Sequence, residues 1–340
     1  MTNSKASEAA RHFALYGDIL DVVPYGNGHI NDTCLLRCSQ AGTVVRYIVQ
    51  RLNTAIFREP EKLMANVSRV LAHCSARLAG QADASRRALT LVPAQDGRPF
   101  WRDADGACWR CYLFIEGATS YDILETPAQA YAAAKAFGAF LALLADIGGE
   151  RLEETIPHFH DTPSRLVAFD AALAADSRNR AALAKDEIAF VAATRHIAPR
   201  LLDLQASGAI PERITHNDTK LNNVMLDNIS GVGICVIDLD TVMPGQSLFD
   251  FGDLVRTSVS PAAEDERDLS KVQLRHDVFA ALAKGYLKGC DGCLTKTEVE
   301  LLPFAGQLIT FEIGLRFLTD YLQGDVYFKT HREGHNLDRC

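Results

Sequence analysis

The fold is decided by residues 213–238, which read RITHNDTKLNNVMLDNISGVGICVID. A short β-rich run opens this stretch, and two more follow at 224–226 and 234–237, separated by the turn sequence DNISG. Short apolar runs that are joined by Asp, Asn, Ser and Gly predict strands in a hairpin. The stretch therefore predicts a strand, then the loop HNDTKLNN, then a β-hairpin.

The loop between the strand and the hairpin carries the candidate chemistry. It places His216, Asp218 and Asn223 at the spacing H-x-D-x-x-x-x-N, which is typical of phosphotransfer loops. The hairpin ends at Asp238, so its second strand should bring a carboxylate back toward Asn223. Mg²⁺ takes few protein oxygens and shares substrate phosphates, so we expect these two side chains to hold Mg·ATP. Asp218 would align the attacking hydroxyl, and Lys220 either assists or is a solvated loop lysine.

Two aspartates beyond the hairpin need separate interpretation. Asp240 points the same way as Asp238 on an extended segment, so it is either a second metal ligand or a polar support for nearby backbone amides. Asp250 belongs to the tripeptide DFG, which holds a metal in protein kinases, but it lies twelve residues past Asp238. We therefore keep the metal at Asp238 and expect Asp250 to support the catalytic loop through backbone amides. The short separation also favours a small acceptor over a peptide.

The residue patterns divide the chain into a sheet-rich part and a helix-rich part. The first part contains β-rich runs at 19–24, 32–38, 44–52, 88–93 and 109–115. A helix is expected from Pro60, and the apolar spacing becomes helical from Thr126 onward. Further helices are expected at 185–204, 268–287 and 298–322.

These patterns predict an α+β fold with two lobes. Residues 1–116 should form a small lobe that consists of an antiparallel sheet and one helix, and this lobe should bind the nucleotide. Residues 117–340 should form a larger, mostly α-helical lobe for catalysis and acceptor binding.

Two places in the predicted N-terminal lobe suit a nucleotide. Gly26 and Gly28 lie in a turn between two strands, where glycines would let backbone amides approach phosphates, although such a pair also occurs in plain turns. Ile115 and Glu116 mark the junction of the lobes, where an extended backbone could hydrogen-bond adenine. We therefore expect both segments to bind ATP.

A basic residue for the phosphates is expected at the end of the third strand. Arg51 occupies that place. A carboxylate on the following helix would fix the guanidinium, and Glu61 is the nearest candidate. The helix dipole also favours a Glu in a first turn, so this carboxylate has a second explanation.

Composition and charge exclude several classes of protein. The 340 residues include 43 acidic and 35 basic side chains without a basic run, which argues against nucleic acid as a partner. The longest apolar run, 136–145, is half of the roughly 20 residues that a membrane span needs. The N-terminus has no secretory signal pattern, so we expect a cytoplasmic protein. Nine cysteines, with CxxC pairs at 108–111 and 290–293, fit reduced structural thiols, with a zinc or redox site as the alternative.

The chain resembles the aminoglycoside phosphotransferase and choline kinase superfamily, which has a protein-kinase-like fold. Its phrases are similar to those of N-acetylhexosamine 1-kinases: HNDTKLNNVML (216–226), VIDLDTVMPG (236–245), GNGHINDT (26–33), FHDTPSR (159–165) and GLRFLTDYLQGDVYF (314–328). The resemblance implies that Asp218 is the catalytic base and that Asn223 and Asp238 hold magnesium. It also implies that Arg316 and Tyr327 approach the sugar.

Two residues leave the resemblance incomplete. Arg316 lies on an apolar helical stretch and could equally be an ion-pair partner of Asp320. Arg51 stands where similar proteins carry a lysine, which leaves its contact with phosphate open.

The expected activity is phosphorylation, with ATP and magnesium, of the anomeric hydroxyl of an N-acetylhexosamine such as GlcNAc or GalNAc. Two other functions stay open. The acceptor could be another hydroxyl or amino compound such as choline, homoserine or an aminoglycoside. The chain could also be a nucleotide-binding regulator without turnover.

Overall fold

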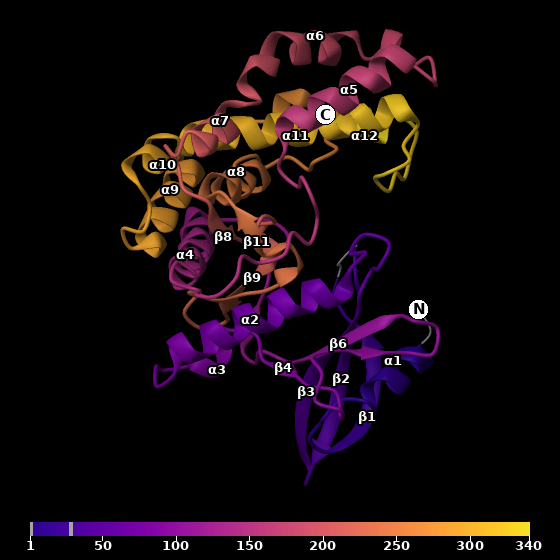
Figure 1. Cartoon of the computed structure of the whole chain (residues 1–340), viewed down its shortest axis with the longest axis vertical. Coiled ribbons are helices and arrows are strands. Elements are labelled where there is room, and N and C mark those ends of the chain that lie inside the picture. The colour runs from indigo at the N-terminus through magenta and orange to yellow at the C-terminus, as the bar shows by residue number, and fades with distance from the viewer. Residues whose placement is uncertain (1–2, 27–29) are drawn as a thin grey trace. The chain divides into compact units, whose positions relative to one another are not determined.

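The computed structural model describes residues 3–26 and 30–340 (Figure 1). The chain divides into two compact units, and each contains more than one stretch of sequence. Unit 1 runs to Thr119 and adds Leu143–Ile156 and Met225–Met243; unit 2 comprises Ser120–Ala142, Pro157–Val224 and Pro244–Cys340. The α+β class is confirmed, since the N-terminal region is an antiparallel sheet and the C-terminal region is helical.

Unit 1 is built on an antiparallel sheet in the order β1-β2-β3-β6-β4, with β5 paired to β6. Its strands are β1 (Asp18–Pro24), β2 (Asp32–Gln40), β3 (Thr43–Arg51), β4 (Leu91–Val92), β5 (Trp101–Arg102) and β6 (Cys108–Leu113). The first three runs and the last were predicted from their sequence within a few residues. The run 88–93 pairs only over two residues, and β5 was not predicted.

Alternating residues of the sheet form the core of unit 1. Cys34, Leu36 and Cys38 on β2 are buried together with Tyr47 and Val49 on β3. Residues two apart on a strand point to the same face, so one face of the sheet is apolar. Helix α1 (Asn3–Ala10) contributes to the same core.

Helix α2 (Pro60–Leu78) begins where the sequence predicted it. Proline fits the first helical turn because its missing N–H would have no partner there. The helix buries residues at helical spacing, among them Leu63, Val67 and Leu71. A short helix α3 (Ala84–Arg87) follows, and a second sheet joins β7 (Ala118–Thr119), β9 (Val224–Asp227) and β10 (Gly233–Val236). The last two strands are the predicted hairpin.

Unit 2 is mainly helical. Its helices are α4 (Pro127–Leu143), α5 (Thr162–Ala175), α6 (Lys185–Thr194), α7 (Arg200–Ala206), α8 (Ser247–Ser258), α9 (His276–Cys290), α10 (Lys296–Glu300), α11 (Leu302–Gln323) and α12 (His335–Arg339). Helices α5, α8 and α12 pack against α11 (Figure 1). The short strands β8 (Arg213–Thr215) and β11 (Met243–Gly245) pair with each other. No helix in the described residues is both long and apolar enough to cross a membrane.

The long predicted helices are shorter in the structure. The run 185–204 breaks near Pro199, and the run 298–322 breaks before Pro303, since proline removes a backbone donor and clashes with the preceding turn. The third run starts only at His276. Helix α5 was not predicted, although Asp161 caps it by accepting a hydrogen bond from the backbone N–H of Ser164 at 3.0 Å.

Candidate active site

The catalytic loop begins directly after β8 and ends in the short 3₁₀ turn Leu221–Asn223. Lys220 Nζ lies 2.9 Å from one carboxylate oxygen of Asp218. Asn223 Nδ2 donates to the other oxygen at 3.0 Å and to the Asp218 carbonyl at 2.8 Å. The structure thus brings these three predicted residues together. The Asp218 side chain keeps 19% of its surface exposed, so a substrate hydroxyl can reach it.

Asp250 holds the backbone of the catalytic loop. Its carboxylate accepts hydrogen bonds from the backbone N–H groups of His216 at 3.0 Å and Asn217 at 2.7 Å. The hydroxyl of Thr219 donates to the carbonyl of Asp250. The prediction that Asp250 supports the loop through backbone amides is confirmed.

The pKa values of the Asp218 and Asp250 carboxyl groups shift in opposite directions. Burial by itself would raise the pKa of Asp218, but the Lys220 ammonium and His216 lower it below its ordinary value. Asp218 is therefore ionised at neutral pH and can accept a hydrogen bond from a hydroxyl. Burial raises the pKa of Asp250 to about 6, although His216 and the two backbone N–H groups favour its charged form.

The predicted ligands of magnesium are an amide oxygen and a carboxylate. The Nδ2 group of Asn223 is directed at Asp218, which leaves the amide oxygen for a cation. Asp238 follows β10 with a left-handed backbone, φ +59°, before the turn Leu239–Thr241. These hard oxygen ligands suit Mg²⁺. Asn223 belongs to unit 2 and Asp238 to unit 1, so their joint coordination of one ion stays a prediction.

Asp240 is a polar support, and its assignment as a second metal ligand is not supported. One oxygen of its carboxylate is bonded by the guanidinium of Arg110, and the other accepts from Asn31 Nδ2 at 2.6 Å. The side chains of Arg110 and Asp240 are 1% and 3% exposed. The Asp240 carbonyl also accepts from the hydroxyl of Thr155 at 2.7 Å. Asp240 therefore fixes the turn that contains Asp238.

Sequence reasoning missed Arg110. Its Nε donates to the side-chain oxygen of Gln50 at 2.9 Å. Burial would lower the pKa of Arg110, but the Asp240 carboxylate keeps it above its ordinary value. The available signal was a single charged residue inside the apolar run CWRCYLF, because a buried charge requires a partner.

The predicted contact between Arg51 and Glu61 is wrong. The register of β2 and β3 places Arg51 opposite Asp32, and the two charges lie 3.5 Å apart on the exposed surface. Residues that face each other on neighbouring strands are the natural partners. Glu61 pairs instead with Arg102 on β5. The contact of Arg51 with a phosphate stays a prediction.

Of the other residues predicted to contact the nucleotide, the structure describes Gly26, Ile115 and Glu116. Gly28 lies outside the described residues. Gly26 has φ +75°, and none of the described residues comes within 4 Å of the place where a Cβ would stand, which suits a close approach by a ligand. Ile115 is buried in an apolar cluster that includes Met225. The carbonyl of Glu116 already accepts from Arg86 Nε at 2.9 Å, so binding of adenine by residues 115 and 116 stays a prediction.

Arg316 and Tyr327 lie close together in unit 2. The guanidinium carbon of Arg316, on α11, is 5.9 Å from the centre of the Tyr327 ring. It is also 6.0 Å from the ring of Phe159 and 5.5 Å from that of Phe328. These distances are in the range of cation–π contacts. The two residues implied to approach a sugar are thus brought together.

Asp320 holds the turn that carries Tyr327. Its carboxylate accepts the backbone N–H groups of Val326 at 2.9 Å, Tyr327 at 2.8 Å and Phe328 at 2.9 Å. Within the described chain it pairs with these amides rather than with Arg316. The ion-pair alternative for Arg316 and Asp320 is therefore not supported.

The comparison with protein families decides the class of this protein. Residues 21–284, which are more than half of the chain, match the model of the phosphotransferase enzyme family. The chain belongs to the phosphotransferase enzyme family.

Solved structures share the fold of this phosphotransferase. A spectinomycin phosphotransferase in complex with ADP and spectinomycin has a TM-score of 0.54 and 13% identity, with 100% of this chain and 93% of that chain covered. The choline kinase from Cryptosporidium parvum has a TM-score of 0.54 and 13% identity, with coverages of 94% and 90%. The Plasmodium vivax ethanolamine kinase has a TM-score of 0.51 and 17% identity, with coverages of 94% and 80%. The protein-kinase-like fold is thus confirmed.

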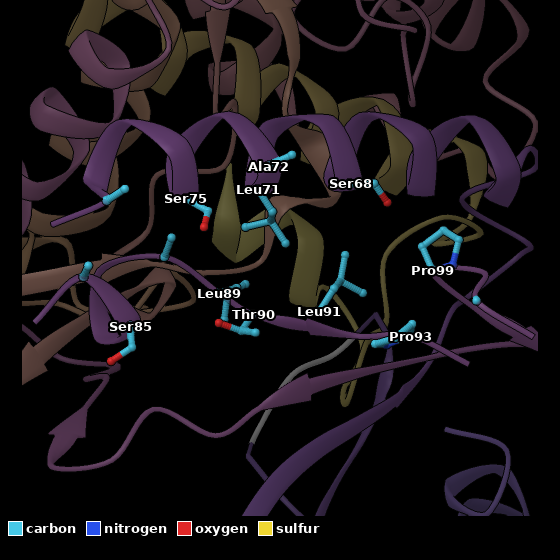
Figure 2. A pocket seen from close by; sticks show the side chains of 14 residues that line it. Ser68, Leu71, Ala72, Ser75, Ser85, Leu89, Thr90, Leu91, Pro93 and Pro99 are labelled. Atoms are coloured by element: carbon cyan, nitrogen blue, oxygen red, sulfur yellow. The ribbon is translucent and has the colours of Figure 1, made fainter. Parts of the chain in front are cut away.

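A pocket of about 760 Å³ in unit 1 of the phosphotransferase is separate from these residues. Figure 2 shows Ser68 and Leu71 of α2 on one side and Leu89 and Leu91 on the other. None of the described residues that line it is titratable. It therefore has no carboxylate, imidazole or thiol that could act as a general acid or base.

The cysteines of the phosphotransferase are free thiols. Cys108 and Cys111 are buried on β6 like small apolar residues. The thiols of Cys290 and Cys293 share a hydrogen bond that lowers the pKa of Cys293 to about 7. In the part of the chain that the structure describes, no three His, Cys, Asp or Glu side chains gather as a metal-binding group. The zinc alternative therefore has no support from these pairs.

Proposed function

We propose that this phosphotransferase transfers the γ-phosphoryl group of Mg·ATP to the anomeric hydroxyl of an N-acetylhexosamine and releases the sugar 1-phosphate and ADP. The observation that carries the proposal is the ionised carboxylate of Asp218, fixed between Lys220 and Asn223 at 2.9 and 3.0 Å. A carboxylate held in one direction can align a hydroxyl for in-line attack.

In the transfer, Asp218 accepts the proton of the sugar hydroxyl while the hydroxyl oxygen bonds to the γ-phosphorus. The bond from the γ-phosphorus to the oxygen that leaves with ADP breaks. Positioning of the reactants should lower the barrier by about 7–11 kcal/mol, and proton transfer to a positioned carboxylate adds about 10²–10⁴-fold. A bound Mg²⁺ would neutralise charge on the phosphate oxygens, with Asn223 and Asp238 as its proposed ligands.

Several features support ATP as the donor. Gly26, Gly28 and Arg51 are proposed to face the phosphates, and Ile115 and Glu116 to face adenine. Solved structures with the same fold contain nucleotides, such as ADP in the spectinomycin phosphotransferase. Gly26, with its left-handed backbone, suits phosphates, and the buried Ile115 suits a flat apolar base.

Charge near Arg316 argues against a cationic acceptor. Burial and the neighbouring guanidinium of Arg316 lower the pKa of Arg165. Within the described residues the buried Nε of Arg165 has no hydrogen-bond partner. Two guanidiniums repel choline, ethanolamine or an aminoglycoside but can donate to the carbonyl of an acetamido group. This charge favours a neutral sugar over a cation.

The position of Arg316 on α11 relates it to the catalytic loop. Glu312 and Arg316 are four residues apart, so they share one face of the helix. Glu312 contacts His160, which in turn contacts the backbone of the catalytic loop at Asn217. The face of α11 that carries Arg316 therefore belongs to the same side of unit 2 as the catalytic loop.

Asp218→Asn tests the proposal most simply. ADP release should be measured with a panel of N-acetylhexosamines and a panel of cationic acceptors, and ATP binding should be measured by calorimetry. We expect turnover only with the sugars, and we expect Asp218→Asn to keep ATP binding while losing at least about 10²-fold in kcat. Asp170→Asn, an exposed carboxylate paired with Arg195, is the matched control. Unchanged turnover in Asp218→Asn, or turnover only with cations, would refute the proposal.

A further inference from the structure

We propose that His160 is a positioning residue that fixes the peptide group between Asn217 and Asp218 and so sets the direction of the Asp218 carboxylate. The inference deepens the proposed function and rests on it for the kinetic part. His160 lies in the phrase FHDTPSR, outside the catalytic loop.

His160 bridges the catalytic loop and helix α11. Its Nδ1 lies 2.9 Å from a carboxylate oxygen of Glu312, and its Nε2 lies 3.2 Å from the backbone carbonyl of Asn217. The side chains of His160 and Glu312 are 4% and 0% exposed. Since both partners are oxygen acceptors, both ring nitrogens must donate a proton. The geometry therefore describes an imidazolium that points one N–H at the loop.

The surrounding charges agree with a charged ring. Burial would lower the pKa of His160, but Glu312, the Asn217 carbonyl and Asp253 on α8 raise it above its ordinary value. Burial would raise the pKa of Glu312, but His160, Thr162 and Arg316 lower it. Both pKa shifts thus favour the ionised form of the pair.

The peptide group between Asn217 and Asp218 is held at both of its edges. Its carbonyl accepts from His160, and its N–H, which belongs to Asp218, donates to Nδ1 of His216 at 3.3 Å. A peptide group is planar, so two contacts on opposite edges fix its rotation. The Asp218 side chain begins at the end of this plane, so the rotation of the plane sets where the carboxylate points.

The backbone at Asn217 needs this support. Asn217 has φ +64°, in the left-handed region. Asn adopts this conformation more readily than most residues with a side chain, and contacts with neighbouring groups hold it in place. Asp250 holds the N–H of Asn217 and His160 holds its carbonyl. Without His160 the peptide group loses one of its two restraints and keeps the contact with His216, so the direction of the Asp218 carboxylate is fixed less tightly.

Two substitutions separate the two contacts of the ring. In His160→Gln the side-chain amide can reach the place of Nε2 and still donate to Asn217. In His160→Asn the shorter amide takes the place of Nδ1, which keeps the contact with Glu312 and loses the contact with Asn217. Misplacement of a catalytic group by about 1 Å can cost about 10²-fold. We therefore expect kcat to fall by about 10²-fold in His160→Asn and by less than about tenfold in His160→Gln, with the KM for ATP unchanged in both.

The experiment also uses a readout that does not depend on turnover. Amide hydrogen exchange of the segment 216–223, followed by mass spectrometry, should speed up in His160→Asn and stay near the wild-type rate in His160→Gln. The exposed His158, changed to Asn, is the control, and it should leave both readouts unchanged. The melting temperature should fall in both His160 variants, and it should fall further in His160→Gln, because that variant removes a partner of the buried Glu312 carboxylate.

The outcomes are distinguishable. Equal kcat in the two His160 variants, or equal exchange of the loop, would overturn the positioning role and leave only a structural one. If the wild type turns over no sugar while the exchange difference is present, the substrate assignment fails and the support of the loop by His160 stands.

Discussion

Two loops that carry proposed site residues, one in each unit, each contain a residue with a left-handed backbone, and they are supported in different ways. The catalytic loop in unit 2 has a left-handed residue at Asn217, φ +64°, and the turn after β10 in unit 1 has one at Asp238, φ +59°. Both lie beside a buried ion pair. In unit 2 the pair, His160 and Glu312, lies outside the loop and touches its backbone.

In unit 1 the loop itself supplies one member of the pair. Asp240 lies two residues after Asp238 and is bound by Arg110 from the sheet. Loss of Arg110 would therefore leave the buried charge of Asp240 in the loop of unit 1. Loss of His160 would instead leave the buried charge of Glu312 on α11, outside the loop of unit 2. We therefore expect the two loops to depend on their ion pairs to different extents, which the following substitutions test.

The largest effect on stability is expected at Arg110. Arg110→Met would leave the Asp240 carboxylate buried and unpaired, which should lower the free energy of unfolding by about 3–5 kcal/mol. Both tryptophans, Trp101 and Trp109, lie in unit 1 on β5 and β6. Urea unfolding followed by tryptophan fluorescence would therefore report on this unit.

A double substitution provides the control for Arg110. Arg110→Met combined with Asp240→Leu removes both charges, so it should be more stable than Arg110→Met alone. Equal losses in the single and double variants would mean that shape at Arg110, and not the charge pair, fixes the turn.

A smaller, pH-dependent effect is expected from Asp250 in unit 2. Its pKa is about 6 in the folded chain and 3.8 for an unperturbed carboxyl, so the folded state binds the proton more tightly. The free energy of unfolding should therefore fall as the pH rises from about 4 to about 6, and then level off. Between about pH 4.5 and about pH 7 the loss should be about 2 kcal/mol.

Asp250→Asn cannot ionise, so it should lack this part of the pH dependence. Urea unfolding of the helices, followed by circular dichroism at both pH values, would compare it with the wild type. If both proteins lose the same stability between the two pH values, Asp250 is not the titrating group.

The smallest effect is expected at Arg51, the exposed counterpart of Arg110. Its contact with Asp32 is 3.5 Å long and exposed, and such surface pairs contribute about 0–1 kcal/mol. Arg51→Ala should therefore barely change the stability of unit 1. The same variant tests the proposed phosphate contact, since the KM for ATP should rise if the guanidinium binds the nucleotide. An unchanged KM would remove Arg51 from the site.

Local patterns explain what could be predicted from the sequence. The hairpin 224–236 follows from apolar runs and a turn sequence, and the contacts among Asp218, Lys220 and Asn223 follow from short spacing in one loop. The support by Asp250 was also predicted. Its tripeptide DFG lies twelve residues past Asp238, the predicted metal ligand, which suggested a different role for its carboxylate.

The buried supports could not be predicted because their partners are far apart in the chain. His160 and Glu312 are separated by 152 residues, and Arg110 and Asp240 by 130. The spacing of residues along a helix or a strand relates only near neighbours in the sequence, so it cannot predict such pairs. The error at Arg51 has the same origin, since the partner of a strand residue depends on the register, and the register places Asp32 opposite it.

The proposed phosphorylation of the anomeric hydroxyl is best tested by locating the new phosphate on the product. The phosphotransferase, ATP, magnesium and N-acetylhexosamines would be incubated, and the product would be examined by phosphorus NMR. We expect a phosphorus signal coupled to the anomeric proton with the wild type, and its loss in Asp218→Asn. A phosphorus signal coupled to protons at another carbon, or no phosphorylated sugar at all, would contradict it.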